Sequence, residues 1–423
     1  MRESGEQSIF FAKEKEKMRR IAFLFIVVGL LISLSTPSFG QGIFMRGVGA
    51  INESFGGAAV GAPLDSMGAL TWNPATISAL PQSEMGFSAA MILPNMKINT
   101  PYGEVNGQPG VAVAPNFGIV SKNPCSRWTF GLGLSTLGGA KAAYPSLKQI
   151  AGPDPTVSAL STLNADIMML QFAPTASYQV TENLSFGFAP TLTMAQILCD
   201  PLYISIPPEG AGALQFPSGT SSRYMFGGGF QFGLYYDTHC NWAFGFSYKS
   251  PQWMEPFRFQ TEEYAADGTY LGPNVRKLHI TVPQIISIGT SYRGFQNTLL
   301  AADLRYYIYS GCGDVQLLGW HNTFSLHLGA QRIINERLTA RMGYVYNDNP
   351  IPDAYAYRNL ASPICHQHML YFGASIKLTP MIEATLCYGH TFRNSLNGAT
   401  PVGMPISVST AADMLALSMR VLF

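Results

Sequence analysis

The amino-acid sequence predicts an all-β fold, namely a transmembrane antiparallel β-barrel of about fourteen strands with an N-terminal hatch (plug) inside the lumen. Three observations lead to this prediction: an N-terminal export signal, apolar residues that alternate with polar or small ones, and short connections that alternate with long ones. The composition agrees, because only 12% of the residues are charged and no long apolar run follows the signal. Typical soluble domains are about 25% charged.

The N-terminal segment 1–40 has the organisation of a secretory signal peptide. Basic residues at 13–20 precede an apolar run from Ile21 to Leu34, and small residues then lead to Gly40. The run is shorter than the roughly 20 residues of a membrane-spanning helix, and its flanks are those of a cleaved signal. We expect cleavage after Gly40, with Met18 as an alternative true start of translation.

Alternation with a period of two predicts the strands. From Leu338 to Tyr346 every second residue is apolar, and the intervening positions carry mostly polar or small residues such as Thr339 and Arg341. A helix would spread the same apolar residues around its whole surface, so the pattern favours a strand. The same alternation recurs at 184–193, 242–249, 370–378 and 414–423.

The connections between these strands alternate in length. Short polar breaks occur near 122–124, 181–183, 237–239, 294–297, 335–337 and 379–380, and long segments rich in Pro and Gly occur near 138–165, 198–221, 258–275, 349–366 and 394–411. Outer-membrane barrels have short periplasmic turns and long outer loops. Counting between the breaks gives about fourteen strands over 85–423, an even number that places both barrel ends in the periplasm.

The last predicted strand ends in Phe423, behind an apolar face that includes Leu415, Leu417 and Val421. A terminal Phe after alternating apolar residues resembles the C-terminal signature by which outer-membrane barrels are assembled. We therefore expect the outer membrane of a Gram-negative cell as the location. The barrel assembly machinery and outer-membrane lipid, including lipopolysaccharide, are the expected partners.

Residues 41–84 lack a sustained period of two and are rich in Gly and other small residues. They are too apolar for a disordered tail, so they need an interior in which to pack. The barrel lumen is the interior that this fold offers. The expected organisation is therefore a signal peptide at 1–40, a hatch at 41–84 and the barrel at 85–423.

The hatch segment resembles the N-terminal hatch of the FadL family of outer-membrane transporters for long-chain fatty acids and other hydrophobic compounds. The nearest match is Asn73-Pro74-Ala75, after Asp65 and Ser66. Further segments agree in order along the chain, at 130–145, 246–251, 282–293 and 338–353. The start of the hatch, the outer loops and the cysteines depart from the family pattern, which leaves the ligand open.

The resemblance implies that an apolar ligand enters an interior pocket and leaves sideways through a gap at an inward kink of the third strand. The third strand begins near Trp128. Hatch residues expected along the ligand path are Ile43, Phe44, Asn73, Pro74 and Ala75, and the candidate kink residues are Gly131, Gly133, Gly138 and Gly139. Gly138 and Gly139 rank second because the expected outer loop begins at 138. Purely structural roles remain open for these residues: Asn73-Pro74 can form a simple turn, and the glycines can be ordinary strand residues.

A ligand with a carboxylate needs a basic partner in the lumen. Arg341, Arg305 and Lys249 face the predicted lumen by alternation, although solvated lumen charges explain such residues equally well. The substrate class is hydrophobic small molecules, either fatty acids and similar lipids or aromatic hydrocarbons. A general porin or a structural barrel is the alternative from another class, but a porin needs an open, charged constriction.

The sequence favours neither an enzyme nor a metalloprotein. Seven histidines are present, but no Gly-x-Ser-x-Gly motif accompanies them, and His366-x-His368 reads more simply as a polar pair at the rim. The six cysteines show no Cys-x-x-Cys spacing, and their pairing cannot be deduced. A net charge of +1 gives no reason to expect nucleic acid. We expect no cofactor, no metal and a monomer.

Overall fold

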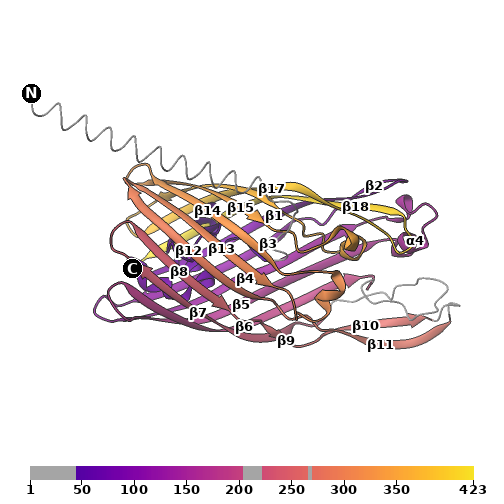
Figure 1. Cartoon of the computed structure of the whole chain (residues 1–423), viewed down its shortest axis with the longest axis horizontal. Coiled ribbons are helices and arrows are strands. Elements are labelled where there is room, and N and C mark those ends of the chain that lie inside the picture. The colour runs from indigo at the N-terminus through magenta and orange to yellow at the C-terminus, as the bar shows by residue number, and fades with distance from the viewer. Residues whose placement is uncertain (1–43, 203–221, 265–268) are drawn as a thin grey trace, which may run out of the picture. The chain divides into compact units, whose positions relative to one another are not determined.

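The computed structural model describes residues 44–202, 222–264 and 269–423 (Figure 1). The expected signal peptide and Ile43 lie outside the described residues. Within the described part of the chain, fourteen antiparallel strands close into a barrel, as predicted, because β18 pairs with β1. The wall strands are β1 (Glu84–Thr100), β3 (Ala112–Lys122), β4 (Trp128–Tyr144), β5 (Leu163–Gln179), β6 (Leu184–Asp200), β7 (Met225–Asp237), β8 (Trp242–Lys249), β12 (Gln284–Phe295), β13 (Thr298–Ile308), β14 (Thr323–Ile333), β15 (Leu338–Asn347), β16 (His368–Lys377), β17 (Ile382–Ala399) and β18 (Pro405–Leu422).

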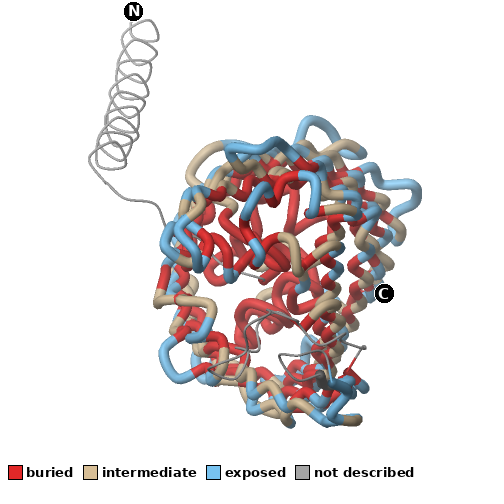
Figure 2. The backbone as a smooth tube through the Cα atoms, turned by 90° about the vertical axis from the view of Figure 1, so that its right-hand side faces the viewer, coloured by how far each residue is buried: buried red, intermediate tan, exposed pale blue. Residues whose placement is uncertain are grey.

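The alternation seen in the sequence becomes an inside and an outside. Along β6, Phe186, Phe188 and Leu192 are exposed on the outer surface, whereas the intervening Ala189 and Thr191 are buried. Figure 2 shows buried residues gathered within the ring of strands. An outward apolar face is what lipid requires of a barrel strand.

Aromatic residues mark the end of the barrel that carries the short turns. Trp128 opens β4 and stacks on Phe130 at 6.0 Å, and Trp242 opens β8 and stacks on Phe244 at 6.3 Å. These exposed rings suit a membrane–water interface, where an aromatic girdle is typical of outer-membrane barrels.

Three expected long loops are wrong in extent. The loop expected at 138–165 is shorter because β4 continues to Tyr144, and the loop at 394–411 shrinks to the turn between β17 and β18. The segment 258–275 contains a separate hairpin of β10 (Phe257–Tyr264) and β11 (Tyr270–Leu278). The ladder of backbone hydrogen bonds continues in these segments although the apolar alternation stops, so the sequence pattern could not reveal it.

Short elements complete the outer end. They are β2 (Gly103–Asn106), β9 (Trp253–Met254), α4 (Pro155–Leu160), η2 (Lys148–Ile150), η3 (Asp314–Leu318), η4 (Asp353–Tyr355) and η5 (Tyr357–Asn359). Apolar residues in and beside these elements, among them Leu147, Leu160 and Leu360, pack in one buried cluster with Phe44 and Tyr307. All six cysteines are free thiols.

Residues 44–83, called the hatch below, form α2 (Ala50–Ser54), α3 (Ser66–Trp72) and η1 (Pro74–Ala79). The helix α2 contacts β15 to β18, α3 contacts β3 and β4, and η1 contacts β4 to β7. The hatch therefore lies inside the barrel and contacts many of its wall strands (Figure 1). No helix of the described residues has the length and apolarity needed to cross a membrane.

Candidate functional site

Glycines on the inner wall let the hatch backbone lie directly on the barrel. A β-carbon at Gly245 would lie 1.7 Å from the carbonyl oxygen of Val60, and one at Gly343 would lie 2.0 Å from the amide nitrogen of Gly56. Only a residue without a side chain allows so close an approach. We call this set the glycine belt: Gly187, Gly233, Gly245, Gly289, Gly329, Gly343 and Gly373.

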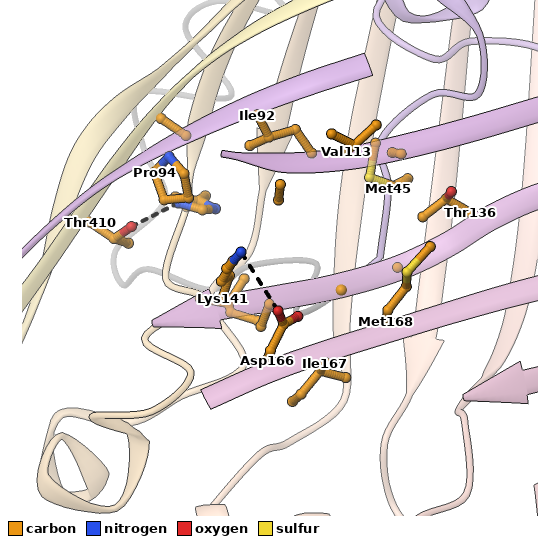
Figure 3. Close-up of a pocket in the computed structure, with 18 of the residues that line it drawn as sticks. Met45, Ile92, Pro94, Val113, Thr136, Lys141, Asp166, Ile167, Met168 and Thr410 are labelled. Carbon is orange, nitrogen blue, oxygen red and sulfur yellow. Dashed lines mark hydrogen bonds and ion pairs between the residues drawn. The ribbon is translucent and has the colours of Figure 1, made fainter. Parts of the chain in front are cut away.

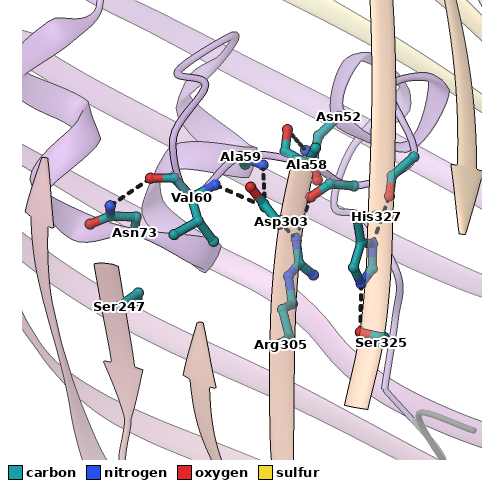
Figure 4. A network of polar contacts seen from close by, with 12 residues as sticks. Asn52, Ala58, Ala59, Val60, Asn73, Ser247, Asp303, Arg305, Ser325 and His327 are labelled. Carbon is teal, nitrogen blue, oxygen red and sulfur yellow. Dashed lines mark hydrogen bonds and ion pairs between the residues drawn. The ribbon is translucent and has the colours of Figure 1, made fainter. Parts of the chain in front are cut away.

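A buried ion pair fixes the middle of the hatch (Figure 4). The Asp303 carboxylate accepts hydrogen bonds from the backbone amides of Ala59, at 2.8 Å, and Val60, at 3.0 Å. Arg305 lies 3.3 Å from Asp303 and donates to the carbonyl oxygen of Gly57. Both side chains are fully buried, so each charge is offset by the other and by the hatch backbone, while Asp303 Oδ1 and Arg305 Nε have no hydrogen-bond partner among the described residues.

Arg305 makes two further contacts, and His327 on the next strand makes two of its own. The guanidinium lies 3.5 Å from the centre of the Trp72 ring and donates to the Arg46 carbonyl oxygen at 3.1 Å. On the next strand, His327 Nδ1 lies 2.7 Å from the Gly56 carbonyl oxygen and its Nε2 lies 2.8 Å from Ser325 Oγ. A carbonyl only accepts, so Nδ1 carries the proton and Nε2 accepts from Ser325.

Asn73-Pro74-Ala75 joins the hatch to itself and to β7. Asn73 Oδ1 accepts the Ala75 amide at 3.1 Å, which caps η1, and Pro74 occupies the first turn, where an amide hydrogen is not needed. Asn73 Nδ2 donates to the carbonyl oxygens of Val60, at 2.8 Å, and Leu234, at 3.0 Å. The motif is therefore a cap that also bonds to the wall.

The three basic residues expected for a carboxylate already have protein partners. Arg305 is bonded to Asp303 and to the hatch backbone. Lys249 donates to Gln171 at 2.9 Å and lies 5.8 Å from the Trp72 ring centre. Arg341 donates to Gln331 at 2.7 Å and also to Ser375.

The barrel wall is incomplete between β3 and β4. Their pairing runs from Lys122–Thr129 to Phe117–Leu134 and stops there among the described residues. On either side the ladders continue, since β3 stays paired with β1 up to Ala112 and β4 stays paired with β5 up to Tyr144. At the edge of the unpaired stretch, the Thr136 amide donates to Asn116 Oδ1 and its hydroxyl donates to the Pro115 carbonyl oxygen, both at 2.9 Å. Side chains there replace the backbone ladder.

The strand β4 carries a bulge directly above this edge. The register with β5 shifts between Thr136 and Gly138, which leaves Leu137 as the extra residue. Gly138 forms an isolated bridge with Phe44, and the Met45 amide donates to the Leu137 carbonyl at 3.1 Å. The bulge in β4 is therefore in direct contact with the first residues of the hatch.

The four candidate glycines fall into two groups. Gly138 and Gly139 lie at the bulge, although their place at the start of the expected outer loop ranked them second. Gly131 and Gly133 lie below it, where a β-carbon would meet the side chain of Leu70 at 2.6 and 3.3 Å. These lower glycines make room for α3.

A cavity of about 200 Å³ opens at the bulge (Figure 3). It lies between β1, β3, β4, β5, β18 and the segment 363–366. Most of its lining is apolar, including Met45, Ile92, Val113, Ile167 and Met168. The polar exceptions are Arg46, Thr136, Lys141, Asp166, His366 and Thr410.

Arg46 and His366 meet in this cavity, and neither was singled out as a ligand residue by the sequence. Arg46 Nη2 lies 2.7 Å from His366 Nδ1, and His366 Nε2 lies 3.1 Å from Thr410 Oγ1. Burial, with Arg46 adding to it, holds the pKa of His366 well below its usual range. One feature of the sequence could have pointed to Arg46, since it is the only basic residue between Gln41 and Glu84.

His366 and His368 do not form a joint site. His368 opens β16 and its Nδ1 lies 2.7 Å from the Tyr344 hydroxyl, whereas His366 faces Arg46. Among residues 44–202, 222–264 and 269–423, no cluster of His, Cys, Asp and Glu is suited to a metal ion.

Comparison with known proteins identifies the relatives of this chain. Residues 29–423 match the model of a family described as outer membrane protein transport protein (OMPP1/FadL/TodX). Among solved structures, the Pseudomonas putida toluene transporter TodX is 18% identical, with a TM-score of 0.69 over 89% of this chain and 99% of that one. A Pseudomonas aeruginosa FadL homologue is 16% identical, with a TM-score of 0.69 over 90% and 100% of the two chains. No curated protein matches.

Proposed function

The chain belongs to the OMPP1/FadL/TodX family of outer-membrane transporters of hydrophobic compounds, and on that premise we propose that it carries long-chain fatty acids or similar lipids. The ligand is captured in the apolar cavity at the β4 bulge and released sideways into the bilayer between β3 and β4. The protein acts in the outer membrane of a Gram-negative cell after removal of its signal peptide at Gly40.

The observation that carries the proposal is the coincidence of the cavity with the unpaired stretch of wall. An apolar solute loses about 25 cal/mol of favourable free energy for each Å² that it exposes to water. An exit from an apolar cavity directly into lipid avoids that exposure. A channel along the barrel axis would not.

The attachment of the hatch to the wall also supports lateral release of the ligand. The glycine belt places hatch atoms, mostly backbone, against β6 to β8, β12 and β14 to β16, and the Asp303–Arg305 pair fixes the hatch at the centre. A plug attached to so much of the wall resists moving as a body. Phe44 and Met45 are bonded to the bulge instead. We assign gating to these two residues and the adjoining Arg46, together with Asn73-Pro74.

Deleting Leu137 tests lateral release. Without the extra residue, β4 regains its register with β5 and loses the carbonyl that holds Met45. We expect uptake of oleate to fall at least tenfold in cells whose own copy has been deleted, while the barrel still shows heat-modifiable migration on gels. Deletion of Gly403, in the tight turn between β17 and β18 and with no atom within 4 Å of its β-carbon position, is the control. Undiminished oleate uptake after the Leu137 deletion would contradict lateral release.

The ligand class and the porin alternative need their own measurements. Growth on oleate and on toluene in the same deletion strain separates the transport of lipids from the transport of aromatic hydrocarbons, the class to which the ligand of the toluene transporter TodX belongs. Large, stable ion currents in planar bilayers would favour a general porin instead. We expect near silence, because the hatch lies inside the lumen and contacts many of the wall strands.

A further inference from the structure

Arg46 stands out as a cation in an apolar cavity. Its side chain lines the cavity beside Met45, and its guanidinium is hydrogen-bonded to the imidazole of His366. The guanidinium Nε is buried and lacks a hydrogen-bond partner. A buried N–H group without an acceptor destabilises the protein, and a charged one does so more strongly.

The charge of Arg46 is also unmatched. None of the ion pairs formed by the described residues includes Arg46, whereas Lys141, the other cation of the cavity, lies 3.7 Å from Asp166. The Arg46 carbonyl accepts from Arg305, which brings a second positive charge close. Glu53 interacts with Arg46 only through space, and burial raises the pKa of the Glu53 carboxyl to about 8, so this group is largely uncharged at neutral pH.

We propose that Arg46 is the head-group receptor of the cavity and selects apolar ligands that end in a carboxylate. This inference rests on the proposed function and names the ligand class for the same cavity. A guanidinium binds a carboxylate through two parallel N–H···O bonds, and one edge of that fork is the unsatisfied Nε. The alkyl chain of the ligand then lies along Ile92, Val113 and Ile167.

His366 occupies the place of the carboxylate while the cavity is empty. Nδ1 accepts from Arg46, so Nε2 carries the proton that is donated to Thr410. A neutral imidazole offers Arg46 one acceptor atom without charge, whereas a carboxylate offers two with charge. The exchange therefore favours the ligand, and His366 holds the guanidinium in position until it arrives.

Arg305, Lys249 and Arg341 are weaker candidates for this role. The first pairs with Asp303 and bonds to hatch carbonyls, and the other two donate to Gln171 and to Gln331 and Ser375. A ligand would have to break these bonds, which hold the barrel and the hatch together. Arg46 has to give up only His366.

The test compares two ligands of equal chain length, laurate and 1-dodecanol, on the full-length mature protein in lipid nanodiscs. Titration calorimetry gives both dissociation constants. We expect wild-type protein to prefer laurate, and Arg46→Gln to weaken laurate binding about tenfold or more while changing dodecanol binding less than about threefold. Arg46→Lys keeps the charge but not the fork, so it should retain part of the preference.

Matched controls separate the head-group contact from general damage. Arg393→Gln makes the same change at an arginine outside the cavity, bonded to Ser409 and Asn95, and should leave the laurate preference unchanged. His366→Leu removes the competitor and should tighten laurate binding severalfold. Heat-modifiable migration checks that each variant retains a folded barrel.

Two sets of results would overturn the inference. If Arg46→Gln weakens the binding of laurate and of dodecanol equally, or weakens the binding of neither, Arg46 does not recognise the head group. The proposal of lateral transport of hydrophobic compounds then still stands. If wild-type protein binds neither ligand, the proposed function falls and this inference falls with it.

Discussion

Replacing Gly245 with alanine tests whether the hatch lies directly on the wall. The new β-carbon would be 1.7 Å from the Val60 carbonyl oxygen, and contacts under 3.0 Å are not tolerated, so the Val60 turn must retreat. Retreat lengthens the 3.0 Å bond from the Val60 amide to Asp303 and the 2.8 Å bond from Asn73 to the Val60 carbonyl. One charge-assisted and one neutral hydrogen bond together are worth about 3 kcal/mol.

Hydrogen exchange measured by mass spectrometry on peptides covering residues 58–75 reports this loss directly. Exchange through local opening speeds up about tenfold for each 1.4 kcal/mol, so Gly245→Ala should exchange about a hundredfold faster there. Gly228→Ala is the matched control, because its β-carbon would meet only the Thr191 carbonyl, at an ordinary 3.7 Å. Equal protection of this segment in wild type and Gly245→Ala would refute the direct contact.

Two further predictions concern buried charges of the lumen. Asp303→Ala leaves Arg305 buried without its carboxylate, so we expect a loss of about 3–5 kcal/mol, seen as a lower temperature of heat modification, with a smaller loss for Asp303→Asn. Burial raises the pKa of Glu53 from 4.5 to about 8, with Asp65 acting in the same direction. The unfolded carboxyl ionises first, so wild-type stability falls as the pH rises from about 4.5 to about 8, by up to about 5 kcal/mol. Glu53→Gln should therefore gain thermal stability over wild type at pH 9 but not at pH 4, and a gain independent of pH would contradict the pKa shift.

The sequence predicted the strands correctly where they face lipid, because a lipid-facing strand needs an apolar residue at every second position. Lipid-facing stretches such as Phe186 to Leu192 repeat with a period of two, and the short polar breaks between such stretches predicted the strand number. The outer parts of β4, β17 and β18 escaped prediction, because a backbone ladder beyond the lipid needs no apolar face. Pro405 at the start of β18 even looks like a loop residue, although a first strand position tolerates proline.

The site was harder to predict because its parts come from distant positions. Arg46 is separated by hundreds of residues from His366 and Thr410, and only the closure of β18 onto β1 brings them together. Arg305, which was expected to bind the ligand, instead holds the hatch through its bond to the Gly57 carbonyl oxygen. Alternation shows that a side chain faces the lumen, but it carries no information about which lumen groups are already paired.

The position of Arg46 in the chain links ligand binding to the wall. Phe44 bridges to Gly138 and the Met45 amide holds the Leu137 carbonyl, so the two residues before Arg46 are bonded to the bulge itself. A ligand that takes Arg46 from His366 acts on the same short segment, within two residues of those bonds. The unpaired stretch between β3 and β4 begins at the same level of the barrel. Occupation of the cavity and the shape of its exit therefore depend on one piece of backbone, which offers a physical route from head-group binding to release.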